Sequence, residues 1–181
     1  GLDLTDAPLL ITYHPVTLEY EQTETRTREL LAALEGTGRD IIFTFPNADT
    51  KGRVIIEMIR EFASREKRCQ IAANLGTQAY FTLMSRAAAM VGNSSSGIIE
   101  AASFKLPVVN IGNRQRGRLH AENVLDVGDS QGEIEAGIAT VLSDQFRDSL
   151  AHLKNPYGDG HASERIVVRL KAVTLGSDLL L

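Results

Sequence analysis

The chain has 181 residues, a single cysteine and a formal net charge of −4, and 43% of its residues are hydrophobic. This length and apolar content suffice for one buried core, while the acidic balance argues against nucleic-acid and membrane-surface partners. The lone Cys69 excludes a disulfide framework and a cysteine-based zinc site, and no apolar run approaches the roughly 18 residues of a membrane span. We therefore expect one cytoplasmic domain over residues 1–181, with 1–8 and 176–181 as loose ends.

The first half of the chain alternates apolar runs with longer amphipathic segments, which predicts strands and helices in turn. The predicted strands cover residues 9–13, 40–45 and 69–72. The predicted helices cover residues 19–34 and 51–66, and a third begins near Thr77, which we expect to cap it. Gly36 ends the first helix as a glycine stop, and Asp49 is placed to cap the second. Polar breaks follow the first two strands at His14 and at Asn47.

The second half continues the same alternation. The predicted strands cover residues 87–91, 107–111 and 122–127. The predicted helices cover residues 98–104, 131–142, 144–153 and 161–173. Strands that alternate with helices at this spacing predict an α/β fold, with a parallel sheet and helices on both of its faces.

The loop of residues 92–97, GNSSSG, joins a predicted strand to a predicted helix. Small residues, hydroxyl groups and the first N–H groups of a helix favour an anion, so the loop predicts a phosphate site. Its spacing does not match a Walker A loop, a dinucleotide fingerprint or a nucleophile elbow. The alternative interpretation is an ordinary helix N-cap supplied by Ser94 or Ser95.

Four polar breaks each follow a different predicted strand, at His14, Asn47, residues 93–95 and Arg114. The carboxyl ends of the strands in an open parallel sheet share one edge, and ligands bind in the crevice there. We therefore expect these four breaks to converge on one site.

The residue types at that edge suit a nucleoside diphosphate. Ser94 and Ser95 supply N–H and hydroxyl donors, and the guanidinium of Arg114 can pair with phosphate oxygens. Ser96 and Glu100 lie four residues apart and so share one face of the helix that leaves the loop. From that face Glu100 could accept hydrogen bonds from two ribose hydroxyls.

Each candidate also has a simpler interpretation. Glu100 could be a solvated helix acid, and Arg114 could pair with Asp126 or Glu122 at the surface. His14 could be a strand-end histidine whose neighbouring proline is plain turn chemistry. The remaining histidines show no metal-ligand spacing, so no metal site is expected; they are His120, His152 and His161.

Five motifs occur in one order: HPVT (14–17), FPNAD (45–49), GNSSSG (92–97), GNRQRGR (112–118) and YGDG (157–160). Together they resemble the C-terminal half of the UDP-N-acetylglucosamine 2-epimerases, over nearly the whole chain. The HPVT and GNSSSG forms are similar to the hydrolysing branch, which makes N-acetylmannosamine and UDP for sialic-acid-type sugars. The GHRRE-like and DSGG-like forms typical of the non-hydrolysing branch are absent from this sequence.

The resemblance implies the C-terminal half of a glycosyltransferase-B-like enzyme, with two Rossmann-like domains and the active site between them. Its N-terminal domain would be missing from this chain. By the same resemblance Ser94 and Ser95 bind the diphosphate, Glu100 binds the ribose, and Arg114 lies beside the nucleotide. Leu75 presents its backbone to the uracil, with Gly76 where some relatives have proline; Asn47 contacts the substrate, and His14 stands at the reacting end.

The family reaction eliminates UDP to give a glycal and then adds water with inversion at C2. This chemistry needs carboxylates for proton transfer, which the family draws largely from the N-terminal domain, and we expect no cofactor. Two other functions stay open: the nucleotide-sugar half of a glycosyltransferase, and a nucleotide-binding module without chemistry. The sequence does not decide between UDP-N-acetylglucosamine and a related diacetamido sugar, nor whether the protein forms a homo-oligomer.

Overall fold

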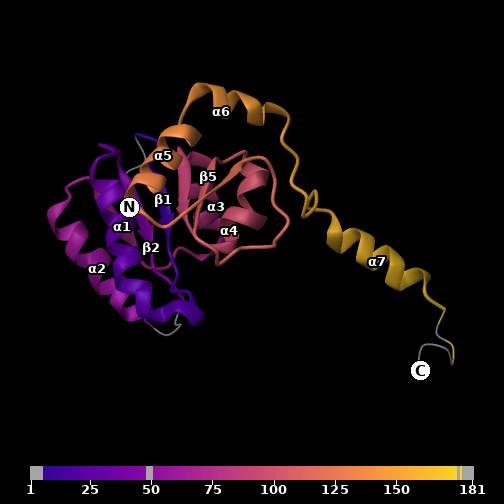
Figure 1. Cartoon of the computed structure of the whole chain (residues 1–181). Coiled ribbons are helices and arrows are strands. Elements are labelled where there is room, and N and C mark those ends of the chain that lie inside the picture. The colour runs from indigo at the N-terminus through magenta and orange to yellow at the C-terminus, as the bar shows by residue number, and fades with distance from the viewer. Residues whose placement is uncertain (1–5, 48–50, 175, 177–181) are drawn as a thin grey trace.

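The computed structural model describes residues 6–47, 51–174 and 176, apart from the side chain of Leu18. Six parallel strands form one sheet in the order β3-β2-β1-β4-β5-β6 (Figure 1). The strands are β1 (Leu9–Thr12), β2 (Ile41–Thr44), β3 (Cys69–Ala72), β4 (Ala89–Gly92), β5 (Val108–Ile111) and β6 (Val124–Val127). The predicted parallel sheet is confirmed, and every strand overlaps a segment predicted to be one.

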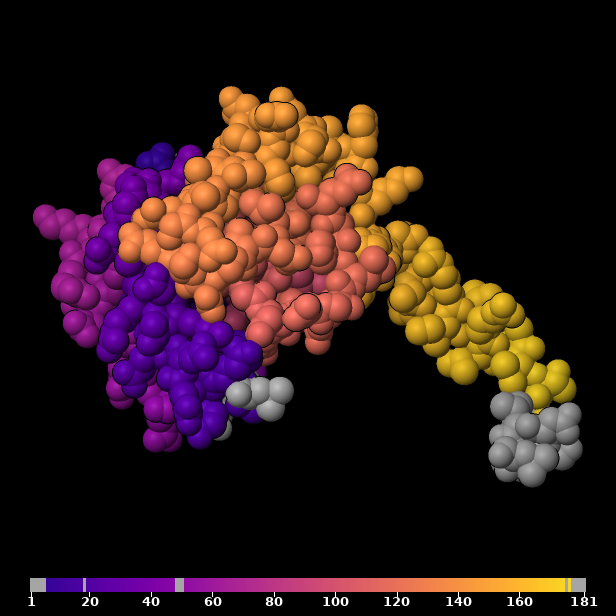
Figure 2. Space-filling view, in the orientation of Figure 1, coloured from indigo at the N-terminus to yellow at the C-terminus, as the bar shows by residue number. Residues whose placement is uncertain are grey.

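Helices cover both faces of the sheet, as predicted. One face carries α1 (Thr23–Glu35), α2 (Gly52–Arg65) and α5 (Gln131–Val141). The other carries α3 (Gly76–Arg86), α4 (Ser95–Ile99) and the 3-10 turn η2 (Ala101–Phe104). The chain then continues through α6 (Asp144–Ser149), the 3-10 turn η3 (Leu150–His152) and α7 (Ala162–Ala172). Helix α7 extends away from the rest of the molecule, and none of its residues is buried (Figures 1 and 2).

Strand β1 lies at the centre of the sheet and contributes to both cores. Leu9 and Ile11 pack on the face covered by α1, α2 and α5, whereas Leu10 packs on the opposite face. A central parallel strand is buried on both faces, so its sequence is a continuous apolar run instead of an alternating one. This is why the strands could be predicted from short unbroken apolar segments.

The helix predicted over residues 19–34 is two elements in the structure. A 3-10 turn, η1 (Thr17–Gln22), precedes α1, and Glu19 inside it has φ −130° and ψ 30°, which is not helical. The Glu19 N–H bonds to the Val16 carbonyl at 2.9 Å, so the chain turns tightly before α1 begins. Helix α1 does end at the predicted glycine, with Gly36 as its C-cap.

Two further expectations were wrong. Thr77 does not cap α3, because the helix starts one residue earlier and the Asn74 side chain accepts the Gly76 N–H at 3.0 Å. Pro8 is not part of a loose end, because it is buried and its carbonyl accepts the Ala88 N–H at 2.8 Å. Asp49, the predicted cap of α2, lies outside the described residues, as do most residues of the two predicted loose ends.

The strand order reverses direction at β1, which pairs with β2 on one side and with β4 on the other. Loops that leave the two sides of such a switch point separate and open a crevice at the carboxyl edge. Gly92 ends β4 beside Thr12, with φ +143°, and a Cβ there would lie 2.1 Å from the Thr12 carbonyl oxygen. Only glycine permits this close approach of the two strand ends.

Candidate functional site

Asn93 joins three of the loops that leave the carboxyl edge. Its side chain accepts the His14 N–H at 2.7 Å and donates to the His14 carbonyl at 2.8 Å. Its carbonyl accepts hydrogen bonds from Arg114 Nη1 at 3.0 Å and from Gln115 Nε2 at 2.8 Å. Asn93 is only 1% exposed, so these contacts are shielded from competing water. The loops after β1, β4 and β5 are thereby fixed to one another.

The loop after β2 reaches the same place through His14 and Asn47. The Asn47 N–H donates to His14 Nδ1 at 3.2 Å, and Asn47 Oδ1 lies 2.8 Å from the same nitrogen. An unprotonated Nδ1 accepts the first contact, whereas a protonated Nδ1 donates in the second. The tautomer of His14 therefore decides which of the two Asn47 contacts is a hydrogen bond.

The serine loop after β4 enters α4 through a side-chain cap. Ser94 has an extended backbone and is the N-cap residue; its Oγ accepts the Ser96 N–H at 3.3 Å and lies 3.1 Å from Ser96 Oγ. The Ser94 side chain is buried, whereas Ser95 and Ser96 are half-buried. The first N–H groups of a helix have no acceptor within it and can donate to a ligand. Capping by Ser94, one of the two alternatives predicted, does not exclude anion binding.

Next to the serine loop is a hollow of about 410 Å³ between the ends of β2 and β3 and the start of α4. Its lining residues are Thr44, Phe45, Ala73, Asn74, Leu75, Gly76, Thr77, Tyr80, Phe81, Ser96 and Glu100. Apolar and aromatic surfaces thus face a few polar groups, a combination typical of small-molecule sites.

Glu100 is the acid of this hollow. Ser96 and Glu100 both line it, as expected from their spacing, and the Glu100 N–H bonds to the Ser96 carbonyl at 3.0 Å. Burial raises the pKa of the Glu100 carboxyl above its ordinary value. Its Oε2 atom is buried and has no hydrogen-bond partner among the described residues. A ligand that brings hydroxyl donors would supply what this carboxylate lacks.

Leu75 lines the opposite side of the hollow, immediately before α3. The next residue, Gly76, has φ +66°, a backbone conformation that proline cannot adopt. A protein with proline at this position would therefore have a different backbone conformation there.

The predicted site residues form two adjoining groups at one edge. His14, Asn47 and Arg114 meet around Asn93, whereas Leu75 and Glu100 line the hollow, and the serine loop lies between the two groups. Sequence reasoning placed Asn93 and Ser96 in the loop but gave neither a binding role. Asn93 directly follows a strand that ends in glycine, and this position in the sequence could have indicated that it contacts the neighbouring loops.

Among the described residues, no group of three or more His, Cys, Asp or Glu side chains is arranged to hold a metal ion. Within the same residues, no helix has the length and apolar character needed to cross a membrane.

Comparisons with known proteins show the family of the chain and its fold. The family model for UDP-N-acetylglucosamine 2-epimerase matches residues 3–171. A UDP-N,N'-diacetylbacillosamine 2-epimerase (hydrolyzing) of Legionella pneumophila is 36% identical over 180 residues. A GDP/UDP-N,N'-diacetylbacillosamine 2-epimerase (hydrolyzing) of Campylobacter jejuni is 44% identical over 119 residues, 65% of this chain. The UDP-GlcNAc 2-epimerase of Methanocaldococcus jannaschii, solved in complex with UDP-GlcNAc and UDP, shares the fold over 92% of this chain and 46% of its own, with a TM-score of 0.69 and 19% identity.

The chain spans about half the length of these relatives or less. The match to the Legionella protein covers 99% of this chain but 46% of that protein, and the Campylobacter match covers 31% of that protein.

Proposed function

Because the chain belongs to the UDP-N-acetylglucosamine 2-epimerase family, we propose that it is the UDP-binding half of a hydrolysing UDP-sugar 2-epimerase. The intact enzyme converts UDP-N-acetylglucosamine, or a related UDP-amino sugar, into a ManNAc-type sugar and UDP. The names of the Legionella and Campylobacter relatives, both described as hydrolyzing, support this branch of the family. The same names favour a diacetamido sugar as the substrate to test beside UDP-N-acetylglucosamine.

The observation that carries the proposal is the buried Glu100 Oε2 atom, which has no hydrogen-bond partner among the described residues, in a hollow beside a serine-capped helix start. In the proposed pose the ribose hydroxyls donate to Glu100, and the uracil lies against the backbone of Leu75. The diphosphate lies over Ser94 and Ser95, within reach of the Arg114 guanidinium. Arg114 already points at this loop, since it donates to the Asn93 carbonyl at 3.0 Å.

On the sugar side we propose that His14 acts at the reacting end, with Asn47 contacting the substrate beside it. In the first step a base takes the C2 proton, the C1–O bond breaks and UDP departs with the bonding electrons. Water then adds to the resulting glycal with inversion at C2. His14 lies in the loop next to the proposed diphosphate position, where its imidazole can stabilise charge that develops on the departing UDP.

The carboxylates for these proton transfers are proposed to come from the remainder of the enzyme, the N-terminal domain. The two described acids close to the site do not suit this task. Glu100 lines the proposed ribose end of the hollow, and the two Glu19 oxygens are held by Asn113 and Arg26. A base must lie within hydrogen-bonding reach of the proton it removes, in a site closed to water. We therefore expect the 181-residue chain alone to leave UDP-N-acetylglucosamine unreacted.

Calorimetric titration of UDP into the chain tests the binding half of the proposal. Arg114→Ala removes a charge-assisted contact and should weaken UDP binding by on the order of 1.5–3 kcal/mol, with a larger effect at low salt. Arg118→Ala is the matched control, because it removes an equal charge from an exposed position of the same loop. No heat of binding at millimolar UDP, or equal losses in both variants, would contradict the proposed diphosphate site.

Product analysis of the intact protein tests the chemistry. Free 2-epimerised amino sugar together with UDP is the expected result. Transfer of the sugar to an acceptor would instead identify a glycosyltransferase, and binding without turnover would identify a non-catalytic module.

A further inference from the structure

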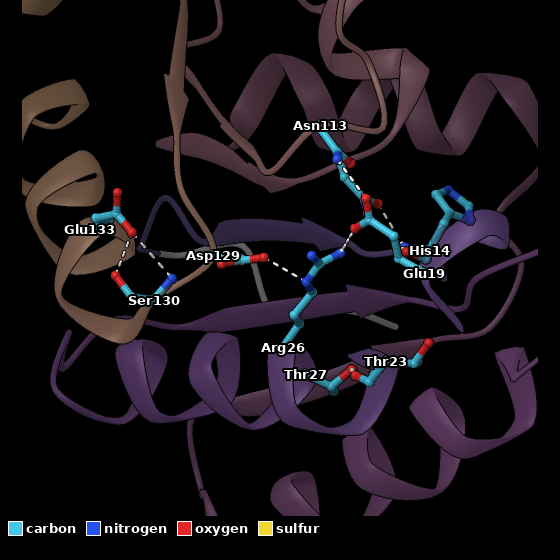
Figure 3. Close-up of polar contacts among 10 residues, drawn as sticks. His14, Glu19, Thr23, Arg26, Thr27, Asn113, Asp129, Ser130 and Glu133 are labelled. Atoms are coloured by element: carbon cyan, nitrogen blue, oxygen red, sulfur yellow. Dashed lines mark hydrogen bonds and ion pairs between the residues drawn. The ribbon is translucent and has the colours of Figure 1, made fainter. Parts of the chain in front are cut away.

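Glu19, Arg26, Asp129 and Asn113 form a chain of polar contacts beside the site (Figure 3). Glu19 Oε1 accepts a hydrogen bond from Asn113 Nδ2 at 2.8 Å, and Glu19 Oε2 pairs with Arg26 Nη1. The Nε atom of Arg26 lies 2.5 Å from Asp129 Oδ2. The contacts link the adjacent elements η1 and α1 with the loops after β5 and β6, which lie far from them in sequence.

This chain of contacts holds the Glu19 carboxylate in one place. Arg26 contacts an acid on each side, and its side chain is only 17% exposed. The hydrogen bond from Asn113, and next the one from Arg26, keeps the pKa of Glu19 below its ordinary value. Glu19 is therefore a fixed anion at neutral pH, with one oxygen directed to Arg26 and the other to Asn113.

Asn113 belongs to the loop that carries Arg114. The Arg116 N–H bonds to the Asn113 carbonyl at 3.0 Å, and the Arg118 N–H bonds to the Gln115 carbonyl at 3.1 Å, so the loop folds as a compact turn. One side of the turn is fastened to Asn93 by Arg114 and Gln115. The other side is fastened to Glu19 by Asn113.

Glu19 also lies close in sequence to His14. The loop that starts at His14 turns into η1 at Val16, whose carbonyl accepts the Glu19 N–H at 2.9 Å. The Glu19 carboxylate thus connects the segment of the proposed reacting histidine with the loop of the proposed phosphate-binding arginine.

We propose that Glu19 is a positioning residue, which acts through its hydrogen bond with Asn113 to hold Arg114 over the serine loop for the diphosphate. This inference rests on the proposed UDP site. Without the bond the loop keeps its attachment to Asn93 but loses the second one, so Arg114 spends less time in the binding geometry.

The inference is tested by UDP titration of the chain with Glu19→Ala, Asn113→Ala and the double variant. Each single change should weaken UDP binding about three- to tenfold, which is less than the full effect of a hydrogen bond to a charged group, because the loop keeps its attachment to Asn93. The double variant should bind UDP as tightly as the single variant with the lower UDP affinity, since both changes remove the same contact. The variant with both Asn113→Ala and Arg114→Ala should have the same UDP affinity as Arg114→Ala alone, because Asn113 is proposed to act through Arg114. Glu24→Ala is the matched control, because Glu24 makes a 3.6 Å ion pair with Arg28 on α1 and does not contact the loop.

Two further readouts separate positioning from general stability. Asn113→Ala keeps both ion pairs of Arg26, so its melting temperature should equal that of the wild-type chain, even if Glu19→Ala is less stable. Amide hydrogen exchange without nucleotide should become faster at Arg116 and Arg118 in Asn113→Ala and Glu19→Ala, but not in Glu24→Ala.

Unchanged UDP affinity in Asn113→Ala, in a chain where Arg114→Ala does weaken binding, would overturn the inference. Losses that add up in the double variant would overturn it as well. If the wild-type chain binds no UDP, the proposed function fails instead, and the exchange measurement alone decides whether Glu19 orders the loop of Arg114.

Discussion

The half-buried carboxylate of Glu100 lowers the folding stability of the free protein, but it is a hydrogen-bond acceptor for the ribose in the proposed complex. Folding raises the pKa of this carboxyl. At pH values between its unfolded-state and folded-state pKa values, the carboxyl is protonated to a greater extent in the folded state than in the unfolded state. Stability therefore falls as the pH rises from the ordinary carboxyl pKa through the raised one, and it stays lower at neutral pH. In the complex, donors from the ribose would offset this cost.

Replacing this acid should therefore separate stability from binding. We expect Glu100→Gln to raise the melting temperature at pH 7, and the gain to disappear below about pH 4, where both forms of the site are neutral. The same variant should weaken binding of UDP more than binding of a deoxyribose analogue. Glu122→Gln, at an exposed position, is the control for loss of one charge. A melting temperature that is unchanged at pH 7, or equal losses for the two nucleotides, would remove Glu100 from this role.

The limits of sequence reasoning at the residue scale follow from distance along the chain. Asn93 bonds to His14 across 79 residues, and Asn113 bonds to Glu19 across 94 residues. A local pattern of polar residues places each side chain at a strand end, because parallel strands share an edge. It cannot indicate which of them meet, since that depends on strand order and loop path.

At the scale of elements, the strand ends of β1 and β4 depend on a single glycine. Gly92 lies so close to Thr12 that a Cβ would sit 2.1 Å from the Thr12 carbonyl oxygen, and its φ of +143° is unfavourable for other residues. Since the contact is with backbone, no side-chain rotation can relieve it. The serine loop begins at the next residue, so its position depends on the same contact.

We expect Gly92→Ala to destabilise the fold by about 3 kcal/mol or more, through the steric contact and the backbone strain together. Gly36→Ala is the control, because that glycine has φ −76° and an added Cβ would meet no atom within 4 Å. Its effect should stay within about 0.5 kcal/mol. Urea unfolding of the three chains measures both differences, and similar midpoints for Gly92→Ala and the wild type would contradict the structure at this point.

The strands were predictable here, whereas the starts of α1 and α3 were not, for a physical reason. Buried parallel strands such as β1 and β2 require unbroken apolar runs, which stand out in the sequence. Helix starts depend on which nearby side chain accepts the first N–H groups. At α3 that side chain is Asn74 and not Thr77, and before α1 the chain forms a 3-10 turn that helical periodicity does not reveal.

At the scale of the whole molecule, several hollows compete as ligand sites, and one of about 700 Å³ lies beside residues 153–160. A second, about 550 Å³, lies between α1 and α2 on an outer helical layer. Its charged rim includes pairs that satisfy each other, Arg28 with Glu24 and Arg65 with Glu61, each at 3.6 Å. A third, about 410 Å³, lies at the carboxyl ends of the strands and is lined by Glu100, whose Oε2 atom has no hydrogen-bond partner among the described residues. Size favours the first two hollows, whereas fold position and unsatisfied chemistry favour the one that contains Glu100.

Amide chemical-shift mapping of UDP on the 181-residue chain decides between these hollows and so tests the central claim most directly. We predict that the largest shifts fall on residues 92–97, Leu75, Glu100 and the loop around Arg114, and that Glu100→Gln and Arg114→Ala reduce them at a fixed UDP concentration. Shifts confined to the facing sides of α1 and α2, with residues 92–97 unmoved, would contradict the account.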